Sequence, residues 1–239
     1  MSSTSGDHSI IFLNNQGARC IASVDYHSAI DCLSRALYSS RTCVHRPIAN
    51  INQATLDISF LMEKGYNKMK TAMENEEQSV ERVTPSDYIY SSPIYVPESA
   101  LLTPGLSTEV AISSIVIFNL ALAHHLLAVQ EQHQYPKQET MTLLAKSMKL
   151  YELAIELQQQ DAILYTANYS SLFILSSLNN LRNVYRMLDN DNASQCCYQH
   201  LLSLLMYLNF HEGCFKTSKD YSAFFNNALQ QSVGAAPAA

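Results

Sequence analysis

Several features are scarce or missing in this 239-residue chain, and each absence narrows its function. It has no tryptophan, and its six glycines stand singly, so no glycine-rich loop is present to hold a phosphate group. The motifs Gly-x-Ser-x-Gly, His-Glu-x-x-His and Cys-x-x-Cys are also missing. The sequence therefore carries none of the usual signatures of serine hydrolases, zinc proteases or zinc ribbons.

Charge is scarce as well. Charged residues make up only 15% of the chain, the net charge is −6, and no block of five basic residues occurs. A nucleic-acid backbone or an anionic membrane surface is therefore not expected as a partner. The start of the chain, MSSTSGDHS, lacks the layout of a signal peptide, and the apolar run near 115–129 is broken by Asn119 and a histidine pair. We therefore predict no membrane span and a cytoplasmic or nuclear location.

What is abundant is apolar residues, which make up 47% of the chain. That fraction is typical of a globular protein, and the length suits one helical domain spanning residues 1–239. Six cysteines without secretory context are expected to be reduced thiols. We predict no cofactor and no metal site.

Residues 10–37, with the sequence IIFLNNQGARCIASVDYHSAIDCLSRAL, predict two amphipathic helices joined at 23–26. Apolar and small residues recur on one face of each half, at the spacing of a helix stripe. In the first half these residues are Leu13, Gly17 and Cys20, and in the second half they are Ala29, Leu33 and Ala36. Small residues would let two antiparallel helices approach closely.

This pattern resembles the tetratricopeptide (TPR) repeat. Gly17, Ala29 and Ala36 stand at its three small-residue positions, and Asp25-Tyr26 matches the turn that opens the second helix. The resemblance returns more loosely, but in phase, over 112–157 and 175–204. The same position of the three repeats is taken by Asn15, Asn119 and Asn180. The resemblance implies an all-α fold of antiparallel hairpins stacked as a short TPR-like α-solenoid.

The predicted organisation starts with a first helical repeat at 10–40, after a loose N-terminus. An irregular insertion follows at 42–108, because five of the seven prolines lie there; one helix at 52–75 and short strands at about 86–96 are expected within it. Longer-helix repeats are predicted at 109–210, with helices 109–131, 141–159, Asp161 to about Leu188, and 193–208. A capping helix at 217–230 and a flexible tail at 231–239 complete the chain.

The resemblance also implies a concave, partner-binding groove. Its expected lining is Asn14, Ala18, Ile21, Phe118, Asn119, Leu122, His125, Asn179, Asn183 and Arg186. Such a protein would be a non-enzymatic adaptor that binds a peptide or a partner helix. Asn14, Ala18 and Asn180 stand where TPR proteins that grip chaperone tails need Lys, Asn and Arg, so a chaperone tail is disfavoured. A second alternative is that residues 86–104 of the chain itself fold into the concavity and fill it.

Three rival functions remain at this point. An enzyme or metal-binding protein would use a Cys/His group, with candidates at His124-His125, Cys196 with His200, Cys43 with His45, and His211-Glu212 with Cys214. A self-associating structural domain would use Phe224, Phe225 and residues 88–96. An RNA-binding helical repeat would need more cations than Arg182 and Arg186. Neither the partner nor the oligomeric state follows from the sequence.

Overall fold

The computed structural model describes residues 4–43, 88–97, 106–132, 137–162, 171–212 and 224, and its side chains are described for 9–40, 88–97, 110–132, 137–158, 171–210 and 224. Apart from 88–97 and the turns, the described residues are helical, which confirms the all-α prediction. The helices are α1 (Thr4–Ala22), α2 (Tyr26–Cys43), α4 (Leu106–Glu131), α5 (Lys137–Ala162), α6 (Ser171–Met187) and α7 (Asp191–Glu212).

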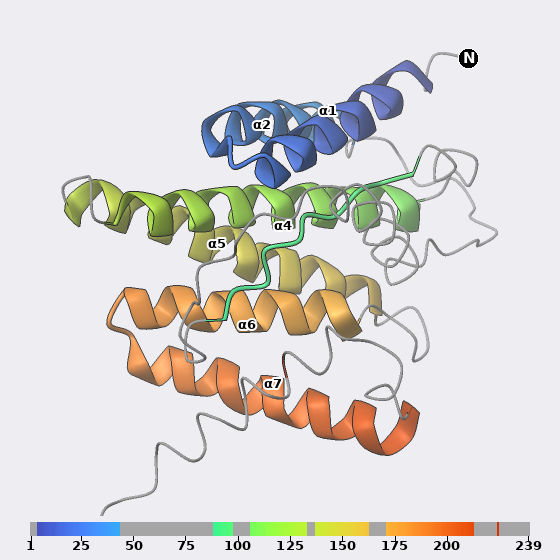
Figure 1. Cartoon of the computed structure of the whole chain (residues 1–239). Coiled ribbons are helices and arrows are strands. Elements are labelled where there is room, and N and C mark those ends of the chain that lie inside the picture. The colour runs from blue at the N-terminus through green and yellow to red at the C-terminus, as the bar shows by residue number, and fades with distance from the viewer. Residues whose placement is uncertain are drawn as a thin grey trace, which may run out of the picture.

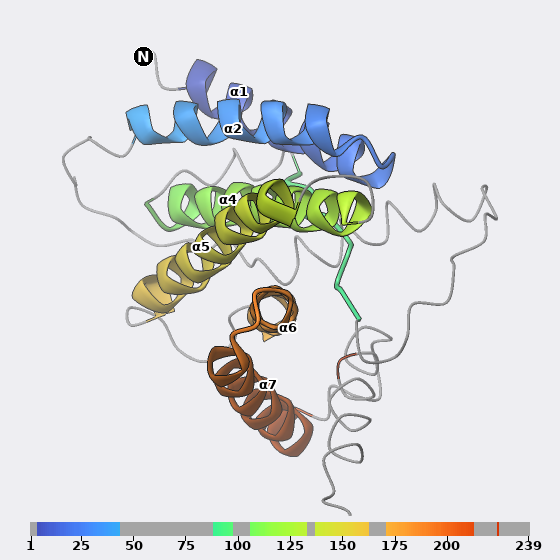
Figure 2. The same cartoon turned by 90° about the vertical axis from the view of Figure 1, so that its left-hand side faces the viewer.

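The helices form three successive hairpins, α1/α2, α4/α5 and α6/α7 (Figure 1). Neighbouring hairpins pack through α2 against α4 and through α5 against α6. Figure 2 shows the same order of hairpins from the side, with α1 and α2 at one end and α7 at the other. The first helices of the hairpins also contact one another, α1 with α4 and α4 with α6, so they line one side of the domain.

The turn between α1 and α2 is a compact cap shared by both helices. Val24 adopts a left-handed conformation with φ of 63°, and the N–H of Asp25 donates to the carbonyl of Cys20 at 2.9 Å. This pairing satisfies a carbonyl at the end of α1 in the manner of a Schellman motif. The carboxylate of Asp25 then accepts the N–H of Ser28 at 3.1 Å and caps α2.

The turn between α6 and α7 repeats this arrangement. Asp189 has φ of 57°, and the N–H of Asn190 donates to the carbonyl of Tyr185 at 2.9 Å. The side chain of Asn190 accepts the N–H of Ala193 at 3.2 Å and caps α7. Two hairpins are therefore closed by the same kind of three-residue turn, whose second residue is left-handed and whose third residue is the N-cap of the next helix.

The first hairpin is held together by a close helix–helix approach. Gly17 faces Leu33, and a Cβ atom at Gly17 would lie 2.5 Å from the Cγ of Leu33. Ala29 and Ala36 on α2 are fully buried. These are the three small residues that the sequence singled out, and a larger side chain at Gly17 would force the helices apart.

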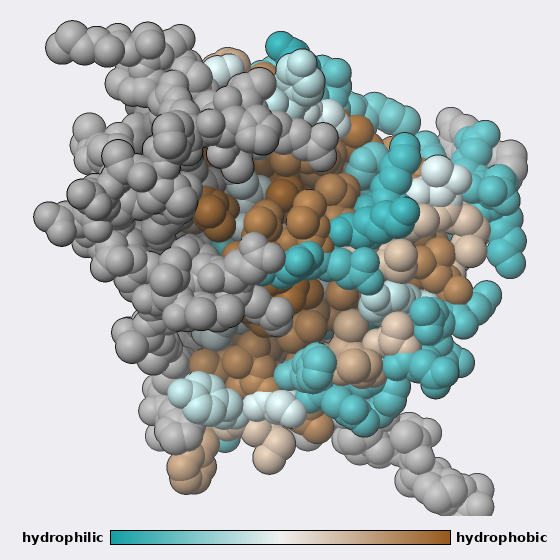
Figure 3. Space-filling model, turned by 180° about the vertical axis from the view of Figure 1, so that it is seen from behind, coloured by the Kyte–Doolittle hydropathy of each residue, from teal (hydrophilic) through white to brown (hydrophobic). Residues whose placement is uncertain are grey.

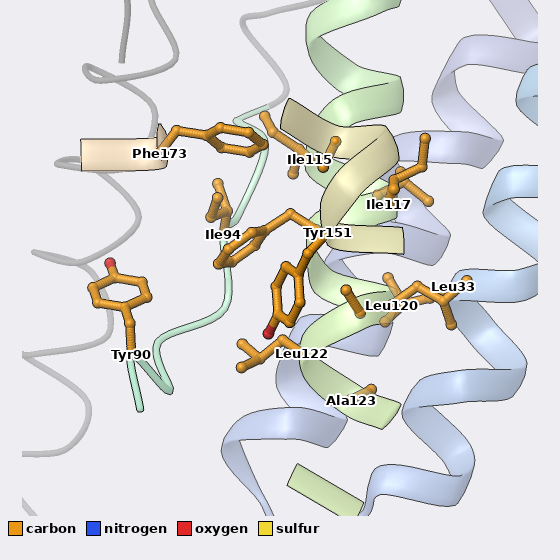
Figure 4. Packing of buried hydrophobic residues seen from close by; sticks show 14 of the residues in the cluster. Leu33, Tyr90, Ile94, Ile115, Ile117, Leu120, Leu122, Ala123, Tyr151 and Phe173 are labelled. Atoms are coloured by element: carbon orange, nitrogen blue, oxygen red, sulfur yellow. The ribbon is translucent and has the colours of Figure 1, made fainter. Parts of the chain in front are cut away.

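Helix α4 forms the centre of the core. By length and composition its Val110–Glu131 part could cross a membrane, with a mean hydropathy of 1.9, and 83% of that apolar window is buried inside the domain. Its neighbours in the core include Leu33 of α2, Tyr151 of α5 and Phe173 of α6 (Figure 4). Figure 3 shows the opposite face of the molecule from Figure 1, where hydrophobic residues gather near the middle and hydrophilic residues lie beside them.

Several predicted helix boundaries are wrong. Helix α1 begins at Thr4, where a loose N-terminus was expected, and α5 begins at Lys137, inside the expected break. In the sequence Pro136 precedes the first residue of α5, so no proline lies inside this helix. The helix predicted from Asp161 to about Leu188 is also wrong, because Asp161 lies in the last turn of α5 and α6 begins at Ser171. Gln158 is buried, so the buried face of α5 continues into the polar residues near the end of the helix. This burial explains why the helix extends beyond its predicted end.

The short strands expected at about 86–96 are not present in residues 88–97, which are neither helix nor strand. The backbone there is extended, but its hydrogen-bonding groups pair with side chains instead of a neighbouring strand. The predicted helix at 52–75, the tail at 231–239 and, except for Phe224, the capping helix at 217–230 lie outside the described residues.

Candidate functional site

Residues 88–97, which we call the strap, run across the first helix of each hairpin. In Figure 1 the strap crosses α4 and α6, and its hydrogen bonds place Tyr90 on α6, Ile94 on α4 and Val96 on α1. The strap therefore runs from the third hairpin to the first, opposite to the order of the hairpins along the chain. For residues 88–97, this arrangement agrees with the alternative in which the chain's own residues occupy the predicted groove.

Two asparagines each bind both backbone groups of one strap residue. The Oδ1 of Asn180 accepts the N–H of Tyr90 at 2.8 Å, and its Nδ2 donates to the carbonyl of the same residue at 2.9 Å. Asn119 binds Ile94 in the same way, with both distances at 2.8 Å. A carboxamide carries one acceptor and one donor group side by side, which matches the N–H and C=O of a single extended residue.

The first hairpin supplies a third clamp of the same kind. Asn15 accepts the N–H of Val96 at 2.9 Å and donates to its carbonyl at 2.7 Å. We call Asn15, Asn119 and Asn180 the clamp asparagines. They are the three residues that the repeat alignment placed at one equivalent position, so each hairpin contributes one clamp from its first helix.

A second asparagine precedes the clamp in the first and third hairpins. Asn179 donates to the carbonyl of Tyr88 at 2.9 Å, and Asn14 donates to the carbonyl of Ile94 at 3.1 Å. Each also donates to the side-chain oxygen of the clamp asparagine that follows it, at 3.2 Å in both cases. Each Asn-Asn pair thus binds two strap residues that are two positions apart.

The clamps are held in place by further hydrogen bonds. The Nδ2 of Asn180 donates to the hydroxyl of Tyr151 at 3.0 Å, and the Nδ2 of Asn119 donates to the Oδ1 of Asn14 at 3.0 Å. Asn180 therefore uses all of its donors and acceptors. With the strap in place Asn14, Asn119 and Asn180 are fully buried, so their hydrogen bonds to the strap backbone are shielded from water.

The strap also buries side chains in the helical core. Tyr90 is 4% exposed; its ring stacks on Phe224 with centroids 5.8 Å apart and tilts against Phe118 at 6.5 Å. Ile94 and Val96 are 2% and 0% exposed. Figure 4 shows Tyr90 and Ile94 among the buried side chains of the helices. The residues named for self-association in 88–96, and Phe224 with them, are therefore largely inside the domain.

His125, expected to line the groove, is fully buried in the interior. Its Nε2 lies 3.0 Å from the Oδ1 of Asn183, and its ring meets Tyr151 edge to face at 6.1 Å. Burial lowers the pKa of His125 to about 4, against the smaller effect of the Asn183 hydrogen bond. The neutral imidazole of His125 orients the side chain of Asn183 in the core. It is poorly suited to general acid catalysis near neutral pH.

The structure separates the ten predicted groove residues into three groups. Asn14, Asn119 and Asn179 bind the strap backbone, and Phe118 packs on Tyr90. The side chains of Ala18, Ile21, Leu122, His125 and Asn183 are buried. Arg186 is exposed near the end of α6.

Asn15 and Asn180 were missing from the predicted groove, although both bind the strap. Their recurrence at one repeat position was the signal that could have identified them. The predicted lining was instead chosen mainly from neighbouring repeat positions, by analogy with the groove of TPR proteins. Arg182, one of the two cations considered for RNA binding, is half-buried, with its guanidinium 4.6 Å from the centre of the Tyr198 ring.

No group of three or more His, Cys, Asp or Glu residues suited to a metal ion occurs among the described residues. In the Cys196-Cys197 pair, burial raises the pKa of Cys197 to about 11, so its thiol stays protonated. His124, also placed in the core, has a pKa lowered to about 4 by burial and by Lys146. The side chains of Cys43, His45, His211, Glu212 and Cys214 lie outside the described set.

No protein-family model, curated protein or solved structure matches this chain.

Proposed function

We propose that this protein is a non-enzymatic, TPR-like adaptor that binds a partner through an extended peptide in the groove formed by α1, α4 and α6. One observation carries the proposal. Three clamp asparagines, one from each hairpin, each bind the N–H and C=O of a single residue in an extended chain. Backbone hydrogen bonds supply affinity for an extended peptide, and pockets for its side chains supply specificity.

The repeated clamp also supports the TPR-like interpretation. Equivalent positions of the first helices perform the same task in all three hairpins, as expected for a stack of related units. The two matching turns at Val24 and Asp189 add a second repeated feature. Neither feature depends on the overall count of helices.

The clamp chemistry favours an extended peptide over a partner helix. In an α-helix the backbone N–H and C=O groups are already paired with each other, so the clamp asparagines would find no partners. A nucleic acid is a poor match as well, because the residues that bind the strap backbone are uncharged amides and the chain carries a net charge of −6.

The test is peptide binding to a chain whose strap is weakened. The full-length variant Tyr90→Gly/Ile94→Gly/Val96→Gly keeps the sequence of the groove helices. It removes three of the side chains that the strap buries against them. A labelled peptide with the sequence of residues 86–99, SDYIYSSPIYVPES, is titrated and its fluorescence anisotropy followed. We expect saturable one-to-one binding.

Adding Asn119→Ala and Asn180→Ala to this variant should weaken binding by roughly tenfold or more per clamp, because each substitution removes two hydrogen bonds from a buried site. The matched control adds Asn192→Ala, an exposed asparagine of α7, and should bind like the parent variant. Circular dichroism establishes that each variant keeps its helices. Folded variants that bind no peptide, or that bind equally with and without the clamps, would contradict the proposed function.

A further inference from the structure

Resting on the function proposed above, we propose that the strap is a built-in competitor for the groove, and that the external ligand is an extended peptide of defined pattern. The pattern has an aromatic residue at position n and β-branched aliphatic residues at n+4 and n+6. In the strap these are Tyr90, Ile94 and Val96. The inference names both the chemistry of the partner and the regulation of its site.

The spacing follows from the arrangement of the helices. The clamps on α6, α4 and α1 bind residues 90, 94 and 96. An extended chain rises about 3.3 Å per residue, so the steps between clamps are about 13 Å and about 7 Å. Because the clamps are anchored in packed helices, a different peptide must present its backbone groups at the same intervals. The register of the ligand is thereby set by the hairpins.

The first side-chain site selects an aromatic residue. The ring of Tyr90 lies against two aromatic rings, stacked on Phe224 at an interplanar angle of 26° and tilted at 58° to Phe118. Tyr88 meets Phe224 edge to face at 5.7 Å and extends this aromatic cluster. Aromatic pairs in these geometries gain more than simple burial provides, which an aliphatic side chain would forgo.

The other two sites select β-branched aliphatic side chains. Ile94 and Val96 are almost completely enclosed, so their sites admit compact apolar groups and exclude charge. Branching at Cβ also favours the extended backbone that the clamps require. Pro93 is buried between the clamps, where no N–H is needed, and it biases Ser92 towards an extended conformation. Proline at n+3 therefore fits the pattern.

Competition follows from chemical equivalence. The strap binds the groove through its backbone groups and through buried side chains that include Tyr90, Pro93, Ile94 and Val96. An incoming peptide of the same pattern can make the same kinds of contact. The clamp asparagines can bind only one backbone at a time, so an external peptide and the strap compete for the same hydrogen bonds. Because the strap is part of the same chain, it acts at an effective concentration of about millimolar. A ligand succeeds when its fit exceeds that of the strap.

The experiment compares the full-length natural chain with the strap-weakened triple-glycine variant, using the labelled 86–99 peptide as the probe. We expect the variant to bind the peptide roughly a hundredfold or more tightly than the natural chain, because the tethered competitor has been disabled. If the triple variant loses its helical circular dichroism, the single substitution Ile94→Ala takes its place in the same comparison.

Three altered peptides test the pattern. N-methylation at the residue equivalent to Ile94 removes the N–H that Asn119 accepts and should cost roughly tenfold or more in affinity. N-methylation at the residue equivalent to Ser92, which lies between the clamps, is the matched control and should cost much less. Exchanging the residues equivalent to Ile94 and Tyr95 keeps the composition but places a larger ring in an enclosed aliphatic site, and should also weaken binding.

The outcomes separate the two proposals. Equal affinity for the natural chain and the strap-weakened variant would overturn competition by the strap. Tight binding that is weakened neither by N-methylation nor by the exchange of residues would overturn the proposed ligand pattern. In both cases peptide binding itself would still support the proposed function. A folded, strap-weakened variant that binds none of the peptides would instead overturn the proposed function, and this inference with it.

Discussion

At the scale of single residues, the choice of asparagine at the clamps has a direct chemical reason. Its carboxamide offers one acceptor and one donor group on a short side chain, as in the pairing of Asn119 with Ile94. Aspartate would accept the N–H but has no donor for the carbonyl, and serine has too short a reach to bind both. Glutamine adds a rotatable bond that must be ordered on binding. An asparagine clamp can therefore bind an extended backbone regardless of the side chain that the bound residue carries.

Val24 occupies a backbone conformation that a β-branched residue rarely adopts, with φ of 63°. Val24→Gly should stabilise the protein by about 1 kcal/mol, because glycine carries no Cβ to clash in the left-handed region. Chemical denaturation measures the change. Asp189→Gly in the matching turn is the control, and its gain should be smaller because aspartate tolerates this conformation. A larger gain at Asp189 would contradict the assignment of strain to Val24.

His125 makes stability depend on pH. Its pKa is lowered to about 4 in the folded protein, while an exposed histidine has a pKa of about 6.5. Between these values the unfolded chain binds more protons, so the free energy of unfolding should fall as pH is lowered from about 6.5 to about 4. From pH 7 to pH 5 the loss from this residue should be about 2 kcal/mol.

The measurement is urea denaturation at pH 7 and pH 5. His125→Gln keeps a donor for Asn183 but does not titrate, so the loss between the two pH values should be smaller. A part will remain, because His124 has its pKa lowered in the same direction. The control is His200→Gln on the exposed face of α7. An unchanged pH dependence in His125→Gln would show that this imidazole is not buried in its neutral form.

At the scale of the helical element, the hairpins depend on close backbone approach. Gly17→Ala should lower the free energy of unfolding by about 1–2 kcal/mol, because the added Cβ would lie 2.5 Å from the Cγ of Leu33. Helix propensity acts in the opposite direction, by about 1 kcal/mol in favour of alanine, so the sign of the change is informative. Thermal denaturation followed at the helical signal measures it, and stabilisation would mean that α1 and α2 do not approach as closely as described.

The strap is an element of another kind, since it has neither helical nor strand hydrogen bonding. Its segment DYIYSSPIYV has the β-prone composition of a strand, and its backbone is extended. The asparagines of α1, α4 and α6 take the part that a neighbouring strand would play. The strand prediction therefore identified the conformation correctly and the bonding partner incorrectly.

At the scale of the whole molecule, the strap joins hairpins that otherwise contact mainly their neighbours. In a linear helical stack, coupling passes from each unit to the next. The strap adds direct bonds from one short segment to the first helices of all three hairpins. We therefore expect a substitution that weakens the strap to lower the stability of the hairpins at both ends of the stack.

Ile94→Ala tests this coupling. The substitution should lower the free energy of unfolding of the whole domain by about 2–5 kcal/mol, as for other buried aliphatic side chains, and amide exchange should accelerate in both α1 and α6. Ser91→Ala, on an exposed strap residue, is the matched control and should leave both helices protected. Faster exchange confined to the strap would mean that it adds no coupling. Binding of the 86–99 peptide should restore part of the lost stability.

The sequence by itself determined the features that depend on near neighbours. Helix-period spacing and small residues predicted the first hairpin, and Asp25 marked its turn, because an N-cap and a close approach leave local patterns. The recurrence of Asn15, Asn119 and Asn180 was visible as well, but not its purpose. Only the tertiary structure decided that purpose, since each clamp needs a strap residue between 25 and 90 positions away along the chain. Helix periodicity carries no information about such distant partners, and neither does it predict that a β-prone segment will lie across helices. The contact forms because a buried carboxamide and an extended backbone satisfy each other once the three hairpins have packed.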